Sequence, residues 1–125
     1  MRVQRGWIGF FRHLPGIEKR IYSRSESLHA PHLPDLEVMQ VLRRLAREGT
    51  VPARRAEEAV LDLQDLRITR YPHFVLLMEI WQRRHNLSAY DATYIVLAEK
   101  LGASLLTRDG RLAGAAGNAA IVEVF

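Results

Sequence analysis

The stretch LSAYDATYIVLAEKLGASLLTRDGRLA, residues 87–113, decides the fold. Apolar residues recur at helical spacing over residues 88–101, and Gly102 supplies the stop that ends such a helix. Residues 104–107 then form a short apolar segment typical of a buried strand. A helix that leads directly into a buried strand is part of a crossover connection, so this stretch predicts a parallel sheet.

The same alternation of helix and strand continues over the rest of the chain. We expect further helices over residues 7–22, 34–49, 52–66 and 72–84, and strands over residues 28–30, 67–71 and 120–124. Prolines near the first turns and glycines near the ends mark several of these boundaries. Residues 114–117, rich in glycine and alanine, are expected to form a small flexible connection. The pattern predicts the α/β class, with a short, mostly parallel sheet covered by helices on both faces.

Length and composition predict one ordinary globular domain over residues 1–125. The chain is 48% hydrophobic and 26% charged, and no apolar run approaches the roughly 20 residues that cross a bilayer. Without cysteine it can form neither a disulfide nor a thiolate zinc site. We therefore expect a cytoplasmic protein with no membrane contact. The net charge of +4 favours an anionic partner such as RNA or an acidic protein.

Asp91 has two interpretations. With Ser88 it forms a capping-box-like pattern, which would satisfy the backbone N–H groups at the helix start. It also leads a row of residues on one helix face that is otherwise apolar and inward-facing. A carboxylate aimed along a buried face needs a partner, so the second interpretation predicts a site.

Three other acids have similar local explanations. Asp109 follows the strand over residues 104–107 and could be a turn residue or a helix cap. Asp35 and Glu37 lie near the start of the expected helix over residues 34–49, where the helix dipole favours any acid. Residues two apart on a helix do not face the same way, so only one of these two would enter a cleft. Periodicity does not choose between them.

The combination of acids at helix starts and strand ends raises the functional interpretation. Parallel strands bring their carboxyl ends to one edge of the sheet, where open α/β folds bind ligands. Carboxylates gathered there repel one another unless a cation is bound. Oxygen ligands without cysteine suit Mg²⁺ or Mn²⁺, ions that activate water for phosphodiester hydrolysis.

Three segments carry a family likeness: LHAPHLPDLEVMQVLRRL (residues 28–45), RYP (residues 70–72) and NLSAYDATYIVLAEKLGASLLTRDGRLA (residues 86–113). Together they resemble PIN-domain ribonucleases, and more narrowly the VapC-type toxins of bacterial type II toxin–antitoxin modules. The resemblance implies a three-layer α/β/α sandwich and a nuclease that hydrolyses RNA phosphodiester bonds with Mg²⁺ or Mn²⁺. It also implies a cognate antitoxin protein and a homodimer.

The resemblance assigns the site residues. Of the four acids that hold metal in the family, Glu37, Asp91 and Asp109 match, which selects Glu37 over Asp35. Thr107 matches the family's hydroxyl near the metal, and it is equally an ordinary β-branched strand residue. These four residues are the candidate catalytic set.

The first family acid has no counterpart. Family members begin with an apolar strand that ends in Asp, whereas this chain has MRVQR at residues 1–5 and no acid before Glu18. We therefore expect a weak or missing first strand and an atypical segment over residues 1–15. A misassigned start or shifted reading frame, or a real degenerate copy, would explain this. The alternative function is a catalytically impaired PIN-like module that binds antitoxin or dimerises without cutting RNA.

Two groups of basic residues are candidates for RNA contact. Arg83, Arg84 and His85 are close in sequence to Asp91, and we take them as the better candidates. The second group lies on the two helices of residues 34–66 and consists of Arg43, Arg44, Arg47, Arg54 and Arg55. These arginines either follow phosphates or form a solvated face paired with Glu57 and Glu58.

Overall fold

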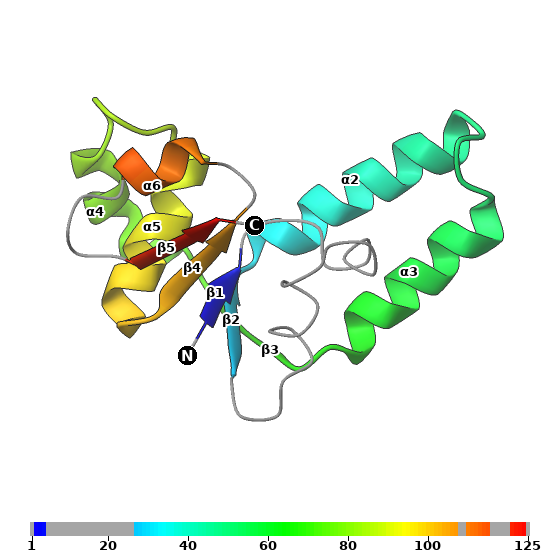
Figure 1. Cartoon of the computed structure of the whole chain (residues 1–125), viewed down its shortest axis with the longest axis horizontal. Helices are drawn as coiled ribbons and strands as arrows, with labels where there is room; N and C mark the ends of the chain where they lie inside the picture. The colour runs from blue at the N-terminus through cyan, green and yellow to red at the C-terminus, as the bar shows by residue number, and fades with distance from the viewer. Residues whose placement is uncertain (1, 5–26, 108–109, 116–120, 125) are drawn as a thin grey trace.

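The computed structural model of the protein describes residues 2–4, 27–107, 110–115 and 121–124. Five strands form one sheet in the order β3-β2-β1-β4-β5, and every neighbouring pair is parallel. Their bounds are β1 Arg2–Gln4, β2 Leu28–Pro31, β3 Ile68–Tyr71, β4 Ser104–Thr107 and β5 Ile121–Val124. The predicted α/β class and parallel sheet are confirmed. Helices lie on both sides of the strands (Figure 1).

The helices follow the expected pattern with small differences in their bounds. They are α2 Leu33–Arg47, α3 Ala53–Asp65, the 3-10 turn η2 Phe74–Leu76, α4 Leu77–Gln82, α5 Ala89–Leu101 and α6 Arg111–Ala115. Gly49 and Gly102 adopt positive φ angles of 76° and 60° after α2 and α5, a conformation that glycine adopts without strain. The helix expected over residues 7–22 lies outside the described residues.

Two expectations were wrong in detail. The single helix expected over residues 72–84 is instead a 3-10 turn followed by α4, and the Leu76 N–H donates to the His73 carbonyl at 2.8 Å in the tighter turn. The connection expected over residues 114–117 begins inside a helix, because α6 runs through Gly114. Short helix starts and small-residue segments carry little periodicity, so both errors fall where the sequence signal is weakest.

The first strand is present but short. β1 has three residues and lies at the centre of the sheet, with Val3 paired to His29 on β2 and to Leu105 on β4. The prediction of a weak first strand is confirmed, and the alternative that it is missing is wrong. The order of strands reverses between β1 and β4, which makes their carboxyl ends the switch point of the sheet.

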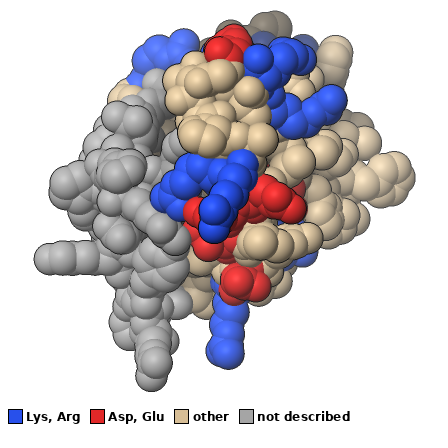
Figure 2. Space-filling view, turned by 90° about the vertical axis from the view of Figure 1, so that its right-hand side faces the viewer, with Lys and Arg blue, Asp and Glu red and all other residues tan. Residues whose placement is uncertain are grey.

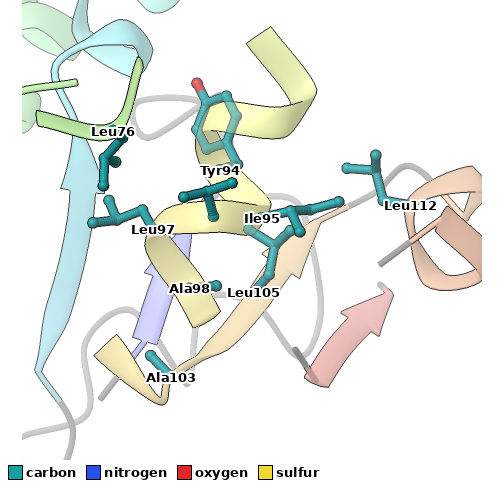
Figure 3. Packing of buried hydrophobic residues seen from close by; sticks show 9 residues of the cluster. Leu76, Tyr94, Ile95, Leu97, Ala98, Ala103, Leu105 and Leu112 are labelled. Carbon is teal, nitrogen blue, oxygen red and sulfur yellow. The ribbon is translucent and has the colours of Figure 1, made fainter. Parts of the chain in front are cut away.

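Helix α5 is the centre of the main hydrophobic core. All seven residues from 92 to 98 are buried, and Tyr94, Ile95 and Ala98 are completely inaccessible. Figure 3 shows this helix packed against Leu105 of β4 and Leu112 of α6. A second core cluster joins β2 to α2 and α3 through Leu28, Val38, Leu42, Ala56, Ala59 and Leu63. These two cores hold α5 and α2 against the sheet.

His29 makes the stability of the fold sensitive to pH. Its side chain is 7% exposed, and burial lowers the pKa of His29 below its ordinary value. The unfolded chain therefore binds more protons than the folded chain just below pH 6.5, so stability is lost as the pH falls through that value. We expect the melting temperature to fall between pH 7 and pH 5.5. The His29→Gln protein should show a flatter profile, and equal slopes for the two proteins would contradict this assignment.

Candidate functional site

The topology brings the ends of two helices to the carboxyl edge of the sheet. α2 begins two residues after β2 ends, so the first turns of α2 lie at this edge. α5 leads into β4 through the single turn at Gly102 and runs antiparallel to it, so the start of α5 lies at the same edge as the end of β4. Three different elements thus bring Glu37, Asp91 and Thr107 to the carboxyl edge of the sheet.

Glu37 is held by a residue of α5. The Tyr94 hydroxyl donates a hydrogen bond of 3.0 Å to Glu37 Oε1, and the two residues are 57 positions apart in the chain. Long side chains on a helix point toward its N-terminus, and Figure 3 shows the Tyr94 hydroxyl directed that way. Because Asp91 lies one turn before Tyr94, this bond brings the Glu37 carboxylate toward the turn that carries Asp91.

Asp91 occupies the first turn of α5 and is half-buried. Its backbone N–H donates a 3.1 Å hydrogen bond to the Ser88 Oγ, which confirms that Ser88 caps the helix. The cap therefore uses the backbone of Asp91. The Asp91 Oδ1 atom is buried, and a carboxylate at a helix start is stabilised by the helix dipole. Both of the interpretations drawn from the sequence remain compatible with this geometry.

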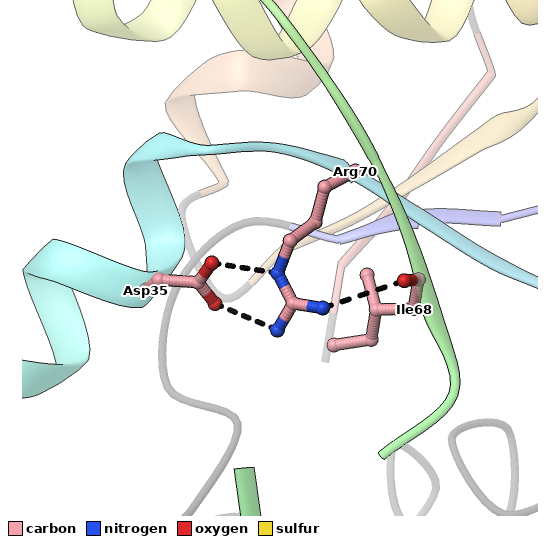
Figure 4. A network of polar contacts seen from close by, with 3 residues as sticks. All are labelled: Asp35, Ile68 and Arg70. Atoms are coloured by element: carbon pink, nitrogen blue, oxygen red, sulfur yellow. Dashed lines mark hydrogen bonds and ion pairs between the residues drawn. The ribbon is translucent and has the colours of Figure 1, made fainter. Parts of the chain in front are cut away.

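Asp35 is occupied by an ion pair with β3. Arg70 Nε and one terminal nitrogen donate hydrogen bonds of 2.6 and 2.9 Å to the two oxygens of Asp35 (Figure 4). This two-point bond raises the pKa of Arg70 above its ordinary value. Asp35 thus ties the start of α2 to β3, while Glu37 contacts α5. The structure separates two neighbouring acids that periodicity could not tell apart.

Of the other two predicted site residues, the structure describes Thr107 but not Asp109. Thr107 is the last residue of β4, is 2% exposed and pairs with Val124 of β5. Asp109 lies outside the described residues. Within the described part of the chain, no three His, Asp or Glu side chains form a group that could hold a metal ion. The three-acid site therefore stays a prediction, with Glu37 and Asp91 as its described members.

The register of β1 locates the position where a first acid would act. Gln4 is the last residue of β1 and lies opposite Leu106, one residue before the end of β4. None of the three residues of β1 carries a carboxylate. Gln4 therefore marks the switch-point end of the central strand, beside Thr107.

The three basic residues near Asp91 have different surroundings. Arg83 forms an ion pair with Glu99 of α5 and is half-buried, so it contributes to the packing of α4 on α5. The Arg84 guanidinium lies 4.5 Å from the centroid of the Trp81 ring. Arg84 and His85 are both exposed. These two remain accessible for RNA contact, whereas Arg83 has a structural role as well.

The arginines of α2 and α3 are mixed with acids. These helices occupy the right-hand side of Figure 1, and the view onto that side in Figure 2 shows basic and acidic side chains interleaved. Arg55 donates a 2.8 Å bond to Glu58, and Arg54 lies 3.8 Å from the same carboxylate. For Arg54 and Arg55 the paired, solvated interpretation is confirmed. Such exposed pairs contribute about 0 to 1 kcal/mol each.

An apolar surface lies on η2 and α4. Its members are Phe74, Val75, Leu77, Met78 and Trp81, which are between 50% and 75% exposed. Four of them follow the spacing of a single helix face. Contiguous apolar surface of this kind marks contact sites in soluble proteins. In the part of the chain that the structure describes, no helix is long and apolar enough to cross a membrane.

Sequence reasoning missed two residues of this site. Tyr94 belongs to the inward-facing row that Asp91 leads, and its hydroxyl partner on α2 is distant in the sequence. Arg70 lay inside a recognised segment, without a predicted partner. A phenol in an otherwise apolar helix is the signal that could have found Tyr94, because a buried hydroxyl needs a partner.

Comparison with known proteins agrees with this architecture. The PIN domain family model matches residues 7–118. The VapC ribonuclease Mb0985 of Mycobacterium bovis is 47% identical over 88 residues, which cover 70% of this chain and 69% of that protein. Ribonuclease VapC1 of Mycobacterium tuberculosis is 46% identical over 90 residues, covering 71% and 68%.

A solved structure shares the fold. PAE2754 from Pyrobaculum aerophilum superimposes with a TM-score of 0.65 over 97% of this chain and 82% of that one, at 23% identity. The predicted resemblance to VapC-type PIN-domain proteins is confirmed. By the extent of the family match and its identity to these relatives, the chain belongs to the PIN domain family.

Proposed function

We propose that this protein is a metal-dependent endoribonuclease and acts as the toxin of a type II toxin–antitoxin module. The reaction adds water across a phosphodiester bond of RNA. The observation that carries the proposal is the meeting of α2 and α5 at the switch-point edge of the sheet, where Tyr94 links the Glu37 carboxylate to the helix that carries Asp91. The relatives named VapC ribonucleases support the same activity.

The donor chemistry fits a hard divalent cation. Glu37 and Asp91 are half-buried carboxylates on neighbouring elements, and oxygen ligands of this kind suit Mg²⁺ or Mn²⁺. We propose that Glu37, Asp91 and Asp109 hold the ion and that the Thr107 hydroxyl lies beside it. When bound, the ion supplies an activated water and neutralises charge on the phosphate. Among the protein's own residues, Tyr94 orients the Glu37 carboxylate through its hydroxyl.

The protein surface suggests how RNA and protein partners are engaged. We propose that Arg84 and His85, and to a lesser extent Arg83, bind phosphates of the RNA near the start of α5. The apolar surface of η2 and α4 supports contact with a protein partner, and we propose that the protein forms a homodimer and binds a cognate antitoxin. We also propose that it is cytoplasmic and has one domain over residues 1–125. The net charge of +4 favours association with RNA through long-range attraction.

A second candidate function rests on one observation. β1 ends at Gln4 and contributes no carboxylate to the carboxyl edge of the sheet, where the site is proposed. Hard cations need several oxygen ligands in defined positions, so a site with one acid fewer binds them weakly. On this alternative, the protein binds an antitoxin or a second copy and does not cut RNA.

The test is cleavage of structured RNA by the purified protein. We expect cleavage in Mg²⁺ or Mn²⁺ and none in excess EDTA, with activity restored when metal is added back. Metal binding is read separately as a rise in melting temperature with Mn²⁺, because a ligand of the native state stabilises it. Equal cleavage with and without EDTA would exclude the metal-dependent mechanism. Little stabilisation by Mn²⁺ together with no cleavage would favour the binding module.

A further inference from the structure

The contact between Tyr94 and Glu37 joins a buried core residue to a candidate metal ligand. Tyr94 is 0% exposed and lies in the core cluster around α5. Its hydroxyl donates a hydrogen bond of 3.0 Å to Glu37 Oε1, and the Glu37 side chain is half-buried. A rigid donor therefore holds a side chain that is otherwise partly open to solvent.

The chemistry of the bond limits how the carboxylate can turn. A phenol hydroxyl has one proton to donate, and a carboxylate has two oxygens with about four acceptor positions. The donated proton fixes one oxygen of Glu37, and the carboxylate retains acceptor capacity for a cation. Glutamate loses considerable rotamer freedom when it is ordered, so an orientation fixed before the ion arrives lowers the cost of binding.

The backbone of Glu37 is fixed by a second contact. The Asp35 carboxylate, two residues earlier on α2, forms the two-point bond to Arg70 of β3. Of these two acids at the start of α2, Asp35 is thus bonded to the sheet and Glu37 is bonded to α5. The turn cannot rotate about the helix axis without breaking one of these bonds.

We propose that Tyr94 is a positioning residue that orients the Glu37 carboxylate for a divalent cation, with the Asp35–Arg70 pair holding the turn beneath it. The inference rests on the proposed metal site. A positioning role of Tyr94 differs from a purely structural role in one measurable respect. A hydroxyl that only satisfies the core changes the free energy of unfolding, whereas a positioning hydroxyl also changes the affinity for the ion.

The experiment compares two variants that each remove one tyrosine hydroxyl. Tyr94→Phe removes the bond to Glu37, and Tyr71→Phe removes a 2.7 Å bond to His29 Nδ1 that involves neither Glu37 nor Asp91. Both keep the aromatic ring and hence the packing. The Kd for Mn²⁺ is measured by calorimetry, and the melting temperature is measured without metal. We expect Tyr94→Phe to raise the Kd for Mn²⁺ about tenfold. This is the lower end of the loss of affinity that follows when a residue that orients a metal ligand is mutated. Tyr71→Phe should leave the Kd within about twofold, because its bond does not reach a metal ligand.

A double-mutant cycle checks that the effect passes through Glu37. In a Glu37→Gln background, Tyr94→Phe should raise the Kd no further, since the carboxylate that it orients is absent. An unchanged Kd in Tyr94→Phe, or an equal rise in both tyrosine variants, would overturn the positioning role while leaving the proposed metal site in place. Absence of Mn²⁺ binding by the unaltered protein would overturn both.

Discussion

Gln4→Asp is expected to raise the rate of RNA cleavage in Mg²⁺ by at least about a hundredfold. Gln4 ends the central strand β1 at the switch point, opposite Leu106 and beside the end of β4. A carboxylate there would join the edge to which α2 and α5 carry Glu37 and Asp91. A well-held ion lowers the barrier to hydrolysis by several kcal/mol, and each 1.36 kcal/mol is a tenfold change in rate. The measurement is the initial rate of cleavage of one labelled structured RNA.

The matched control is Gln4→Asn, which has the size of Asp without its charge. If the Asp and Asn proteins cut RNA at the same rate, the lack of a first acid does not limit activity. If the Asp protein cuts and the unaltered protein does not, the chain as it stands is a binding module on an intact PIN scaffold. The Mn²⁺-dependent rise in melting temperature should follow the same order as the rates.

Asp91→Asn is expected to lower RNA cleavage by at least about a hundredfold and to remove the stabilisation by Mn²⁺. The substitution removes one negative charge from the proposed site, so the ion would be held less well and the barrier to hydrolysis would rise. Each 1.36 kcal/mol of that rise lowers the rate tenfold. It leaves the fold intact for a specific reason. The cap of α5 is formed by the backbone N–H of residue 91 and the Ser88 hydroxyl, so it does not depend on the carboxylate. Rates are measured in the unaltered chain and in the Gln4→Asp chain.

Asp65→Asn provides the comparison, because Asp65 is an exposed acid at the end of α3. It should change neither the rate nor the response to Mn²⁺. Cleavage that survives in the Asp91→Asn protein would refute the assignment of Asp91 as a metal ligand. A loss of the metal-free melting temperature by many degrees would instead show that Asp91 acts mainly in the stability of α5.

Much of the fold could be predicted because its signals are local. Gly102, with its positive φ, ends α5 where the sequence predicted, and the strand that follows occupies the expected residues 104–107. The pattern that begins at Pro34 predicted α2 within a residue at its start. Periodicity and punctuation by proline and glycine are properties of a few neighbouring residues, so one sequence contains them.

The site could be predicted only in part, because its contacts join distant residues. No local pattern assigns the site to Asp35 or to Glu37, since both lie near the start of α2, where an acid is favoured by the helix dipole. Their roles separate only when Arg70 and Tyr94 arrive from other elements. The position of Gln4 at the switch point likewise depends on strand order, which a three-residue strand does not reveal.

The burial of α5 has a consequence for how the protein loses activity. Seven successive residues of this helix, 92–98, are buried, so we expect their backbone amides to be among the slowest to exchange with solvent. Asp91 lies in the first turn of α5, directly before that buried segment. Heating or denaturant should therefore leave the proposed metal ligand Asp91 in place until the cooperative transition, so we expect inactivation and global melting to occur together.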